Sequence, residues 1–425
     1  MKGFVENRFG LFLLVLIALG CLYGVAYVTR PAPARPQPPG PRKVAVESVT
    51  VACPPAGQKV SVFQQGALVR KAVKGPVSGP GTLEAGYTVR ETSGKDRGLA
   101  GVRCAEPAAT TWLIGPGPAT ADVVLHLTNA DRAPAIADIL LYAAEGPVLS
   151  DKAAGVVIAP GEHRAVDLKT LAPSSDVLAV GVVTTTGRLA VAARASYGGK
   201  GVDWLPSSTP PATSLVVPGV PGGGGRRELL VAAPGEADAV VSIKVVSEDS
   251  SYAMKGRETL EVPAGSVAAL DVTTGLGGQS AALVLTSDQP VVAGVVATGT
   301  GASQDVAFTA GTAPLDLGSV VADNGKGSKL VLTAPGAAGK VRVEVVPGGK
   351  PFEVDVAAGR TKNVKLTAKG DFGVVVTPVS GTVYGARVTE ERLKSGLLLT
   401  VSPLAPGRTW AMLPTLTADP AVVLP

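Results

Sequence analysis

The chain has 425 residues, a formal net charge of +5, and 46% hydrophobic, 17% charged and 4% aromatic residues. This weak, dispersed charge and the scarcity of aromatic side chains argue against nucleic-acid binding, which needs a concentrated basic face with stacking rings. Abundant Val, together with 53 Gly and 35 Pro, favours strands and turns over helices. We therefore expect an all-β protein of roughly two to four domains.

The first predicted element is a transmembrane helix at residues 9–28. This run has no charged side chain, and at about 1.5 Å per residue it matches the roughly 30 Å hydrocarbon core of a bilayer. The basic residues Lys2 and Arg8 precede it, which predicts an uncleaved signal anchor with residues 1–8 in the cytoplasm. Four basic residues soon after the helix oppose this orientation, but charge bias is weaker when a long folded domain is translocated. We therefore expect a single-pass cell-membrane protein with its C-terminal body outside the cytoplasm.

Two forms of processing remain open for this segment. Ala18-Leu19-Gly20-Cys21 loosely fits a lipoprotein signal, which would be cut before Cys21 so that this residue is lipidated. The sequence stays apolar from Leu22 to Val28, however, where a mature lipoprotein begins with a polar tether. The signal anchor is favoured over the lipoprotein and over ordinary signal cleavage.

Two segments separate the helix from the rest of the body. Residues 29–43 are rich in Pro and predict an extended, semi-rigid spacer. Residues 44–111 contain Cys53 and Cys104, the only cysteines outside the helix. Two cysteines in an extracytoplasmic chain are most simply a disulfide. We interpret residues 44–111 as disulfide-closed strands that cap the first of three sandwiches.

A strand–turn–strand pattern then occurs three times, at intervals of about one hundred residues, which suits tandem immunoglobulin-like β-sandwiches. Its turns contain Gly161, Gly265 and Gly359, each preceded by Pro or Ala and followed by an aliphatic pair spaced by two. Glycine in this position predicts a turn with positive φ. The predicted boundaries are 112–209, 214–312 and 317–406 for the three repeats and 407–425 for a C-terminal tail.

The histidines and the repeated aromatic positions are the next candidate sites. His126 alternates with leucines and is expected to face solvent, and a two-histidine metal site with His163 would need carboxylates that cannot be placed. The sequence therefore predicts no metal site. Trp204 aligns with Phe308, each shortly after an aspartate (Asp203 and Asp305), which favours packing over a sugar-binding platform. Alanine at either histidine or either aspartate is expected to cost little.

No catalytic or cofactor-binding residue is predicted. Glu248-Asp249 and Glu390-Glu391 are adjacent pairs, so in a strand their side chains point to opposite faces. The run Gly222 to Gly225 resembles a phosphate loop, but no Gly-Lys-Ser/Thr follows it and a strand comes next instead of a helix.

Several short motifs resemble a known family. They are Cys53-Pro54, Cys104 shortly before Trp112-Leu113-Ile114-Gly115, Val217-Pro218-Gly219, and the Ser287 to Gly294 stretch. Together they resemble a domain-of-unknown-function family of membrane-anchored or secreted envelope proteins from high-GC Gram-positive bacteria. The resemblance implies an envelope location and brings no activity, cofactor or catalytic residue.

The sequence thus favours a non-enzymatic scaffold or protein-interaction protein of the bacterial cell envelope, anchored through residues 9–28. Its expected partners are other envelope proteins or a cell-wall polymer. The alternative is a binding module for cell-wall polysaccharide or another envelope polyanion, using Arg70, Lys71 and Lys74. An enzyme is the third hypothesis.

Overall fold

The computed structural model describes residues 2–29, 40–54, 59–73, 75–301, 304–394 and 396–414. It divides into two units, of which the first comprises residues 1–43 with 412–425 and the second Val44–Ala411. In the first unit, α1 (Lys2–Val28) contains the segment Phe9–Val28, which is long and apolar enough to serve as a membrane anchor or a signal sequence. Most of the predicted spacer (residues 30–39) and most of the predicted tail (415–425) lie outside the described residues.

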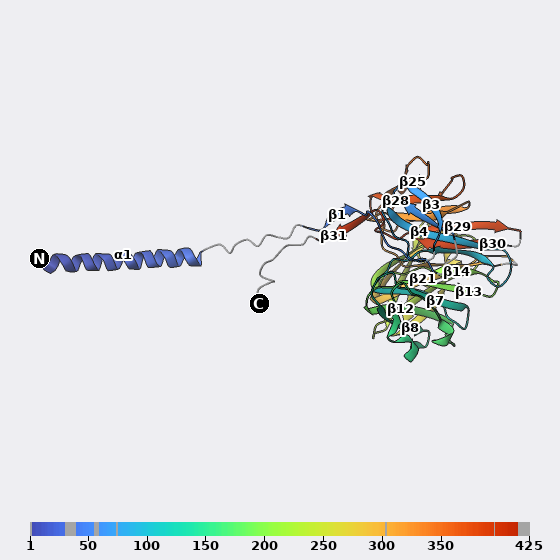
Figure 1. The fold of residues 1–425 in the computed structure, drawn as a ribbon, viewed down its shortest axis with the longest axis horizontal. Helices are drawn as coiled ribbons and strands as arrows, with labels where there is room; N and C mark the ends of the chain where they lie inside the picture. The colour runs from blue at the N-terminus through green and yellow to red at the C-terminus, as the bar shows by residue number, and fades with distance from the viewer. Residues whose placement is uncertain are drawn as a thin grey trace. The chain divides into compact units, whose positions relative to one another are not determined.

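The rest of the chain is mostly β, as its composition predicted, and the predicted transmembrane segment is helical (Figure 1). At the boundary of the two units, β1 (Arg42–Ala45) pairs with β31 (Trp410–Leu413). Next to this pair, the backbone N–H of Val46 donates a 3.0 Å hydrogen bond to the carbonyl of Thr409. The two ends of the second unit therefore meet.

The first repeat consists of two facing sheets. One sheet has the order β10-β8-β12-β6, with β9 added to β8, and the other has the order β11-β7-β13-β14. Side chains from both sheets, such as Leu141, Val180 and Leu125, share one core. The strands are β6 (Thr110–Pro116), β7 (Asp122–Thr128), β8 (Ala135–Ala143), β9 (Gly146–Val148), β10 (Val156–Ile158), β11 (His163–Asp167), β12 (Val177–Thr186), β13 (Ala190–Ser196) and β14 (Val202–Leu205).

The third repeat repeats this arrangement, with sheets β23-β28-β25-β26 and β27-β24-β29-β30. The second repeat does so too, except that β21 is long enough to take part in both of its sheets. The strands of the second repeat are β15 (Ala212–Val220), β16 (Arg227–Ala233), β17 (Ala239–Ser247), β18 (Ser251–Ala253), β19 (Thr259–Val262), β20 (Ser266–Asp271), β21 (Ala281–Thr298) and β22 (Val306–Ala310), with a short helix α2 (Thr273–Leu276) before β21. Those of the third are β23 (Ser319–Asn324), β24 (Ser328–Ala334), β25 (Gly339–Val346), β26 (Phe352–Val356), β27 (Arg360–Lys365), β28 (Phe372–Ser380), β29 (Tyr384–Leu393) and β30 (Gly396–Pro403).

Residues 44–111 form a four-stranded sheet of their own in the order β3-β2-β4-β5. The strands are β2 (Lys59–Gln64), β3 (Ala67–Ala72), β4 (Thr82–Glu91) and β5 (Gly98–Arg103). Taken along the chain, their order in the sheet is second, first, third, fourth, which is also the order in β11-β7-β13-β14 and its counterparts. We call this sheet the N-terminal module. It has the topology of the second sheet of a repeat.

The strand order departs from that of the immunoglobulin fold at the ends of each repeat. The neighbours β7–β11 and β8–β12 correspond to the B–E and C–F pairs of an immunoglobulin sandwich. The first strand, β6, lies beside β12, and β13, the strand that follows β12, lies beside β7. Compared with an immunoglobulin sandwich, these two strands have exchanged sheets. The structure shows three two-sheet repeats in which only the central strand pairs follow the immunoglobulin pattern.

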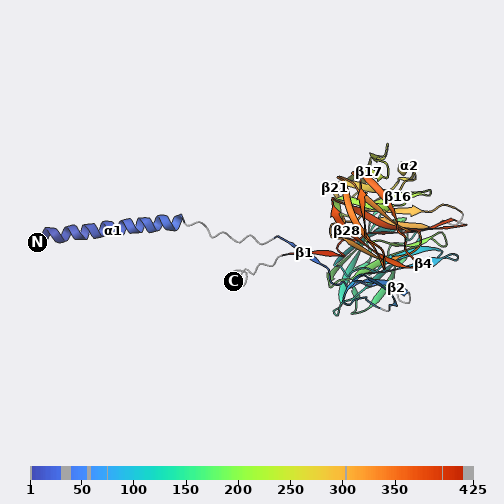
Figure 2. The same ribbon diagram turned by 90° about the horizontal axis from the view of Figure 1, so that it is seen from above.

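The hydrophobic core continues from one repeat into the next. Phe308 of the second repeat packs in the core of the first, and Ala297 shares a cluster with Leu399 of the third. The N-terminal module packs on the first repeat through Trp204 and on the third through Phe63. The four parts therefore close a ring, and the residues Val44–Ala411 form one compact unit (Figure 2). The three repeats are therefore not separate sandwiches joined only by linkers.

The predicted turns and cysteines have the following geometry. Gly161, Gly265 and Gly359 have φ values of +70°, +66° and +62°, which residues other than glycine rarely adopt. Cys53 and Cys104 are joined in a disulfide, and both pack in the core of the N-terminal module.

Candidate functional site

The four parts of the ring meet along a central axis. Each contributes the last strand of one sheet, β5, β14, β22 or β30, and each of these strands contacts the next in cyclic order. The C-terminal ends of β5, β14 and β30, together with the residues that follow β22, line one cleft of about 340 Å³. The central strands thus run in the same direction, and the cleft opens at the end where they finish. Figure 1 labels β14 and β30 at mid-height in the right half of the compact unit.

Two aspartates are buried along this axis, and neither is exposed to solvent. Asp305 accepts hydrogen bonds from the backbone N–H groups of Leu99 (3.0 Å), Val202 (3.4 Å), Val306 (2.9 Å) and Leu399 (2.9 Å). One carboxylate therefore bonds to all four parts of the ring. A Cβ at Gly98 would lie 2.6 Å from its Oδ1, so glycine is required for this close approach.

Asp203 lies on β14 and accepts hydrogen bonds from the N–H of Gly101 and the hydroxyl of Thr400, both at 3.0 Å. Its second carboxylate oxygen is buried without a hydrogen-bond partner among the described residues, as is Nε of the buried Arg387. Burial raises the pKa of Asp203 well above its usual range, and the negative charge of Asp305 raises it further. Burial also raises the pKa of Asp305 to about 6, although its four backbone hydrogen bonds act in the opposite direction. These carboxylates connect strands and are not open to a substrate.

The cleft is lined by backbone, hydroxyl and proline groups from all four parts. Its lining residues include Gly101 to Ala105, Thr110, Thr111, Trp204 to Thr209, Gly311 to Ala313, Val401 to Pro403 and Arg408. The hydroxyls of Ser208 and Thr209 are buried and have no hydrogen-bond partner among the described residues. Their backbone N–H groups are bonded to the carbonyls of Trp112 and Gly311. The two side-chain hydroxyls therefore have unused hydrogen-bonding capacity at the wall of the cleft.

The one strongly buried cation at the cleft is neutralised by carboxylates. Arg408 is 6% exposed and forms ion pairs with Glu84, at 2.8 Å, and with Glu106. Glu84 also accepts two hydrogen bonds of 2.6 Å from Arg103. Burial lowers the pKa of Arg408 to about 10, so it stays charged at neutral pH. The cleft is thus polar without a net charge excess that would select an anion.

The only two histidines of the chain lie together on β7 and β11. Nδ1 of His126 is 3.1 Å from Nε2 of His163, and the ring of His126 lies 5.2 Å from that of Trp204. His126 is buried at 7% exposure, so the prediction that it faces solvent is wrong. Burial, the neighbouring His163 and Arg194 lower the pKa of His126 to about 4.

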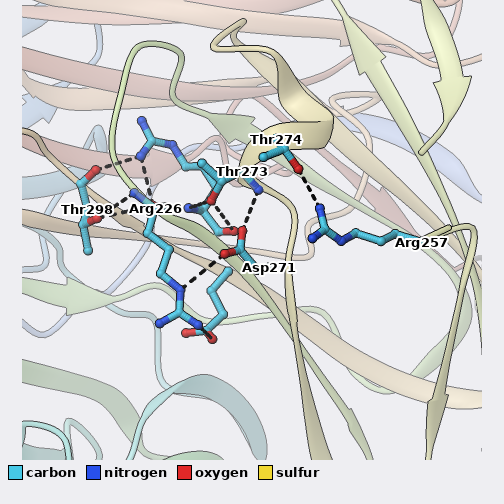
Figure 3. A network of polar contacts seen from close by, with 8 residues as sticks. Arg226, Arg257, Asp271, Thr273, Thr274 and Thr298 are labelled. Atoms are coloured by element: carbon cyan, nitrogen blue, oxygen red, sulfur yellow. Dashed lines mark hydrogen bonds and ion pairs between the residues drawn. The ribbon is translucent and has the colours of Figure 1, made fainter. Parts of the chain in front are cut away.

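The glycine-rich loop of residues 222–225 surrounds a cation and not a phosphate. The guanidinium of Arg227 is buried and donates hydrogen bonds to five carbonyls, those of Pro221, Gly222, Gly224, Arg226 and Thr298. A phosphate loop instead presents N–H groups to its ligand. Beside it, Arg226 contacts Asp271 and Thr298, and Arg257 donates to Thr274, as Figure 3 shows. This network fixes the edge of the second repeat.

The other residues singled out from the sequence are dispersed. Glu248 accepts a hydrogen bond from Asn363 and Asp249 from Gln279, while Glu390 pairs with Lys329 and Glu391 with Arg90. Within each pair the two carboxylates thus bond to different partners. Of the predicted basic surface, Arg70 forms an ion pair with Asp371, and Lys74 lies outside the described residues. Trp112 and Trp204 are buried, as a packing role requires.

Sequence reasoning detected Asp203 and Asp305 as repeated positions but not their burial. Asp305 directly precedes β22, and Asp203 is the second residue of β14. A carboxyl group next to or within a short apolar run, near the aligned aromatic residue of two repeats, was the available signal, because it persists there only if the fold provides hydrogen bonds.

The fold and the axial cleft define a mostly β protein with three sandwich repeats and an N-terminal apolar helix. The chain belongs to the family of unknown function DUF5719, whose model matches residues 64–367. A comparison with curated proteins found no match. Among solved structures, an anti-sigma factor domain-containing protein from Clostridium clariflavum matches with 10% identity over 85% of this chain and 98% of its own, but with a TM-score of 0.14. That score is too low to indicate a shared fold.

Proposed function

We propose that this protein is a non-enzymatic scaffold or protein-interaction protein of the bacterial cell envelope, which binds its partner at the axial cleft. The observation that carries the proposal is the use of the polar side chains around the axis. Asp305 and Asp203 accept strand hydrogen bonds, and Glu84 and Arg408 neutralise one another. None of these groups is poised as a nucleophile with an adjacent base, which acid–base or covalent catalysis needs. The cleft instead offers hydroxyls, carbonyls and a fixed shape.

The proposed location is outside the cytoplasm, with residues 9–28 as a single-pass anchor. The disulfide between Cys53 and Cys104 supports an oxidising compartment. Protease added to spheroplasts is expected to degrade the body, while the protein remains in the membrane fraction. A body protected from protease would contradict this topology. Release of Cys21→Ser protein into the medium would instead establish lipidation as the means of attachment.

The scaffold proposal is tested by cross-linking in cells. A photo-reactive amino acid at Ser207, an exposed residue of the cleft wall, is expected to capture an envelope protein. The same amino acid at Leu149, which is 93% exposed on the first repeat, is the matched control for surface capture. Equal capture of the same proteins at both positions would contradict a partner site at the cleft.

A second candidate function is the binding of a neutral cell-wall polysaccharide in the same cleft. The buried, unpartnered hydroxyls of Ser208 and Thr209 favour it, because sugar hydroxyls are good partners for such groups. Binding of a polyanion is less favoured, because Arg70 of the predicted basic surface is already paired with Asp371.

Pull-down with purified wall polysaccharide separates these alternatives. A neutral glycan in the cleft is expected to resist added salt and to be lost in the double variant Ser208→Ala, Thr209→Val. Binding to a polyanion falls steeply with salt and should not depend on those hydroxyls. If neither behaviour is found, the scaffold proposal is favoured over both.

A further inference from the structure

The pairing of the two histidines is a feature that the proposed function does not use. The chain has only two histidines among 425 residues, 37 positions apart. The register of β7 with β11 places His163 opposite Thr128 and His126 opposite Ala165. The two side chains are therefore diagonal neighbours on one face of the sheet, and their ring nitrogens meet at 3.1 Å.

The ring geometry is that of two nitrogens facing one another. The ring centroids are 5.3 Å apart and the planes differ by 26°. The two facing nitrogens are 3.1 Å apart, so the centroids and the nitrogens lie nearly on one line and the rings meet edge to edge. Without a ligand, one imidazole donates its N–H and the other accepts it. The accepting ring is therefore neutral, the form in which histidine binds metals.

The nitrogen separation suits a transition-metal ion. With metal–nitrogen bonds of about 2.0 Å, two ligand nitrogens lie about 2.8 Å apart at a right angle and about 3.3 Å apart at the tetrahedral angle. The observed 3.1 Å falls between these values. Each ring would tilt so that both lone pairs point to one ion, and the exposed side chain of His163 has room to do so. The donating ring moves its N–H to its other nitrogen through solvent, so no net proton is released.

The surroundings leave one open side and balance the nearest charge. The neighbours of the two histidines across β7, β11 and β13 include Ala165, Ala190 and Ala192, and the ring of His126 packs against that of Trp204, so an ion approaches from the exposed side of His163. The nearby guanidinium of Arg194 is paired with Asp96 at 2.8 Å, which offsets its repulsion of a cation. The described residues contain no group of three or more His, Cys, Asp or Glu side chains that could hold a metal. The remaining coordination positions would therefore be filled by water or by a partner.

We propose that His126 and His163 form a binding site for one divalent transition-metal ion, with Cu²⁺ or Zn²⁺ as the ions that suit imidazole ligands. The site is open on the side of His163. An ion held there can take a further ligand from another molecule at the surface of the first repeat.

The test uses the full chain in detergent, produced without a histidine tag. Titration with Zn²⁺ followed by calorimetry is expected to show one site per chain. Because the sequence has only two histidines, imidazole nitrogen couplings in the pulsed EPR spectrum of bound Cu²⁺ can come only from them. Two coupled imidazoles per ion are expected.

The informative variant is His163→Gln, because this exposed residue can be replaced without disturbing the core. Loss of one of two ligands on a rigid sheet should weaken binding by about tenfold or more and leave a single imidazole coupling. Asp176→Asn, at an exposed carboxylate of the same repeat, is the matched control and should bind as the wild type does. Binding that is unchanged in His163→Gln, or a Cu²⁺ spectrum without imidazole couplings, would overturn the proposal. So would the absence of any binding in the folded wild-type protein.

Discussion

Gly265 of the second repeat packs directly against Pro147 of the first. A Cβ added at Gly265 would lie 2.8 Å from Cγ of Pro147, at the tip of the β8–β9 hairpin. Gly359 of the third repeat meets Ser251 of the second in the same way, at 3.4 Å, near the tip of the β17–β18 hairpin. The second and third repeats thus place their turn glycines on a hairpin of the repeat before them, while nothing lies within 4 Å of a Cβ at Gly161 of the first repeat.

This relationship predicts different effects for the same substitution at two turns. Gly161→Ala strains only a backbone with positive φ and should cost about 1–2 kcal/mol of unfolding free energy. Gly265→Ala has the same strain and also displaces Pro147, so a cost of about 2–4 kcal/mol is expected. Urea denaturation followed by circular dichroism measures both. Equal losses of unfolding free energy in the two variants would mean that Pro147 moves aside at no measurable cost.

The turns illustrate what could be predicted from sequence. Positive φ at Gly161, Gly265 and Gly359 follows from local chemistry, because Gly after Pro or Ala suits one kind of turn. The contact between Gly265 and Pro147 is not local, and nothing in either segment indicates it. The ring could not be predicted either, because Phe308 and Trp204 are apolar side chains that would be buried in any arrangement of the sandwiches. The strands of residues 44–111 were predicted, but their similarity to one sheet of a repeat was not, because their β2–β3 turn is Gln65-Gly66 and lacks the repeated Pro/Ala-Gly pattern.

The candidate site also has features that the sequence predicts and features that it does not. Alignment of the repeats matches Trp204 with Phe308, each shortly after an aspartate. The alignment could not show that Asp305 accepts hydrogen bonds from N–H groups more than 90 positions away. Likewise, the diagonal contact of His126 with His163 depends on the register of β7 with β11, which pattern alone leaves free.

Removal of the Asp305 carboxylate should destabilise the whole ring. Asp305→Ala leaves four backbone N–H groups from four parts of the unit without their acceptor, and we expect a loss of about 3–5 kcal/mol. This loss is much larger than the small cost that the sequence analysis predicts for alanine at this position. Asp305→Asn retains one oxygen for Leu99 and Leu399 and should cost less. Asp288→Ala, at an exposed aspartate that accepts from Val240 alone, is the control and should cost about 1 kcal/mol. Denaturant midpoints compare the three variants, and a loss in Asp305→Ala no larger than that of the control would contradict the role of the axis.

The same carboxylate predicts a pH dependence of stability. Burial raises the pKa of Asp305 from 3.8 to about 6, so between about pH 4 and pH 6 the folded protein binds more protons than the unfolded chain. The contribution of Asp305 to stability is therefore greatest below pH 4 and falls as the pH rises through 6, by up to about 3 kcal/mol. Asp305→Asn cannot titrate and should lack this component. The measurement is the difference in unfolding free energy between wild type and Asp305→Asn at pH 4.5 and at pH 7.5, which removes the contribution of His126. A difference that does not change with pH would show that the hydrogen bonds keep the pKa of Asp305 near its ordinary value.

Loss of the disulfide should affect all parts of the ring together. The bond closes a loop of 51 residues, and chain entropy gives it a stabilisation of about 4 kcal/mol. If the repeats were independent domains, only the first should melt earlier when the bond is lost. Since the N-terminal module packs on both the first and the third repeats, we now expect the residues Val44–Ala411 to unfold in one transition whose midpoint falls in Cys53→Ser, Cys104→Ser. Differential scanning calorimetry of the soluble body, residues 40–425, measures this, with unreduced wild type as the control. If the double variant shows an early transition for the first domain while the second and third repeats melt as in the wild type, then the contacts around the axis do not couple the repeats.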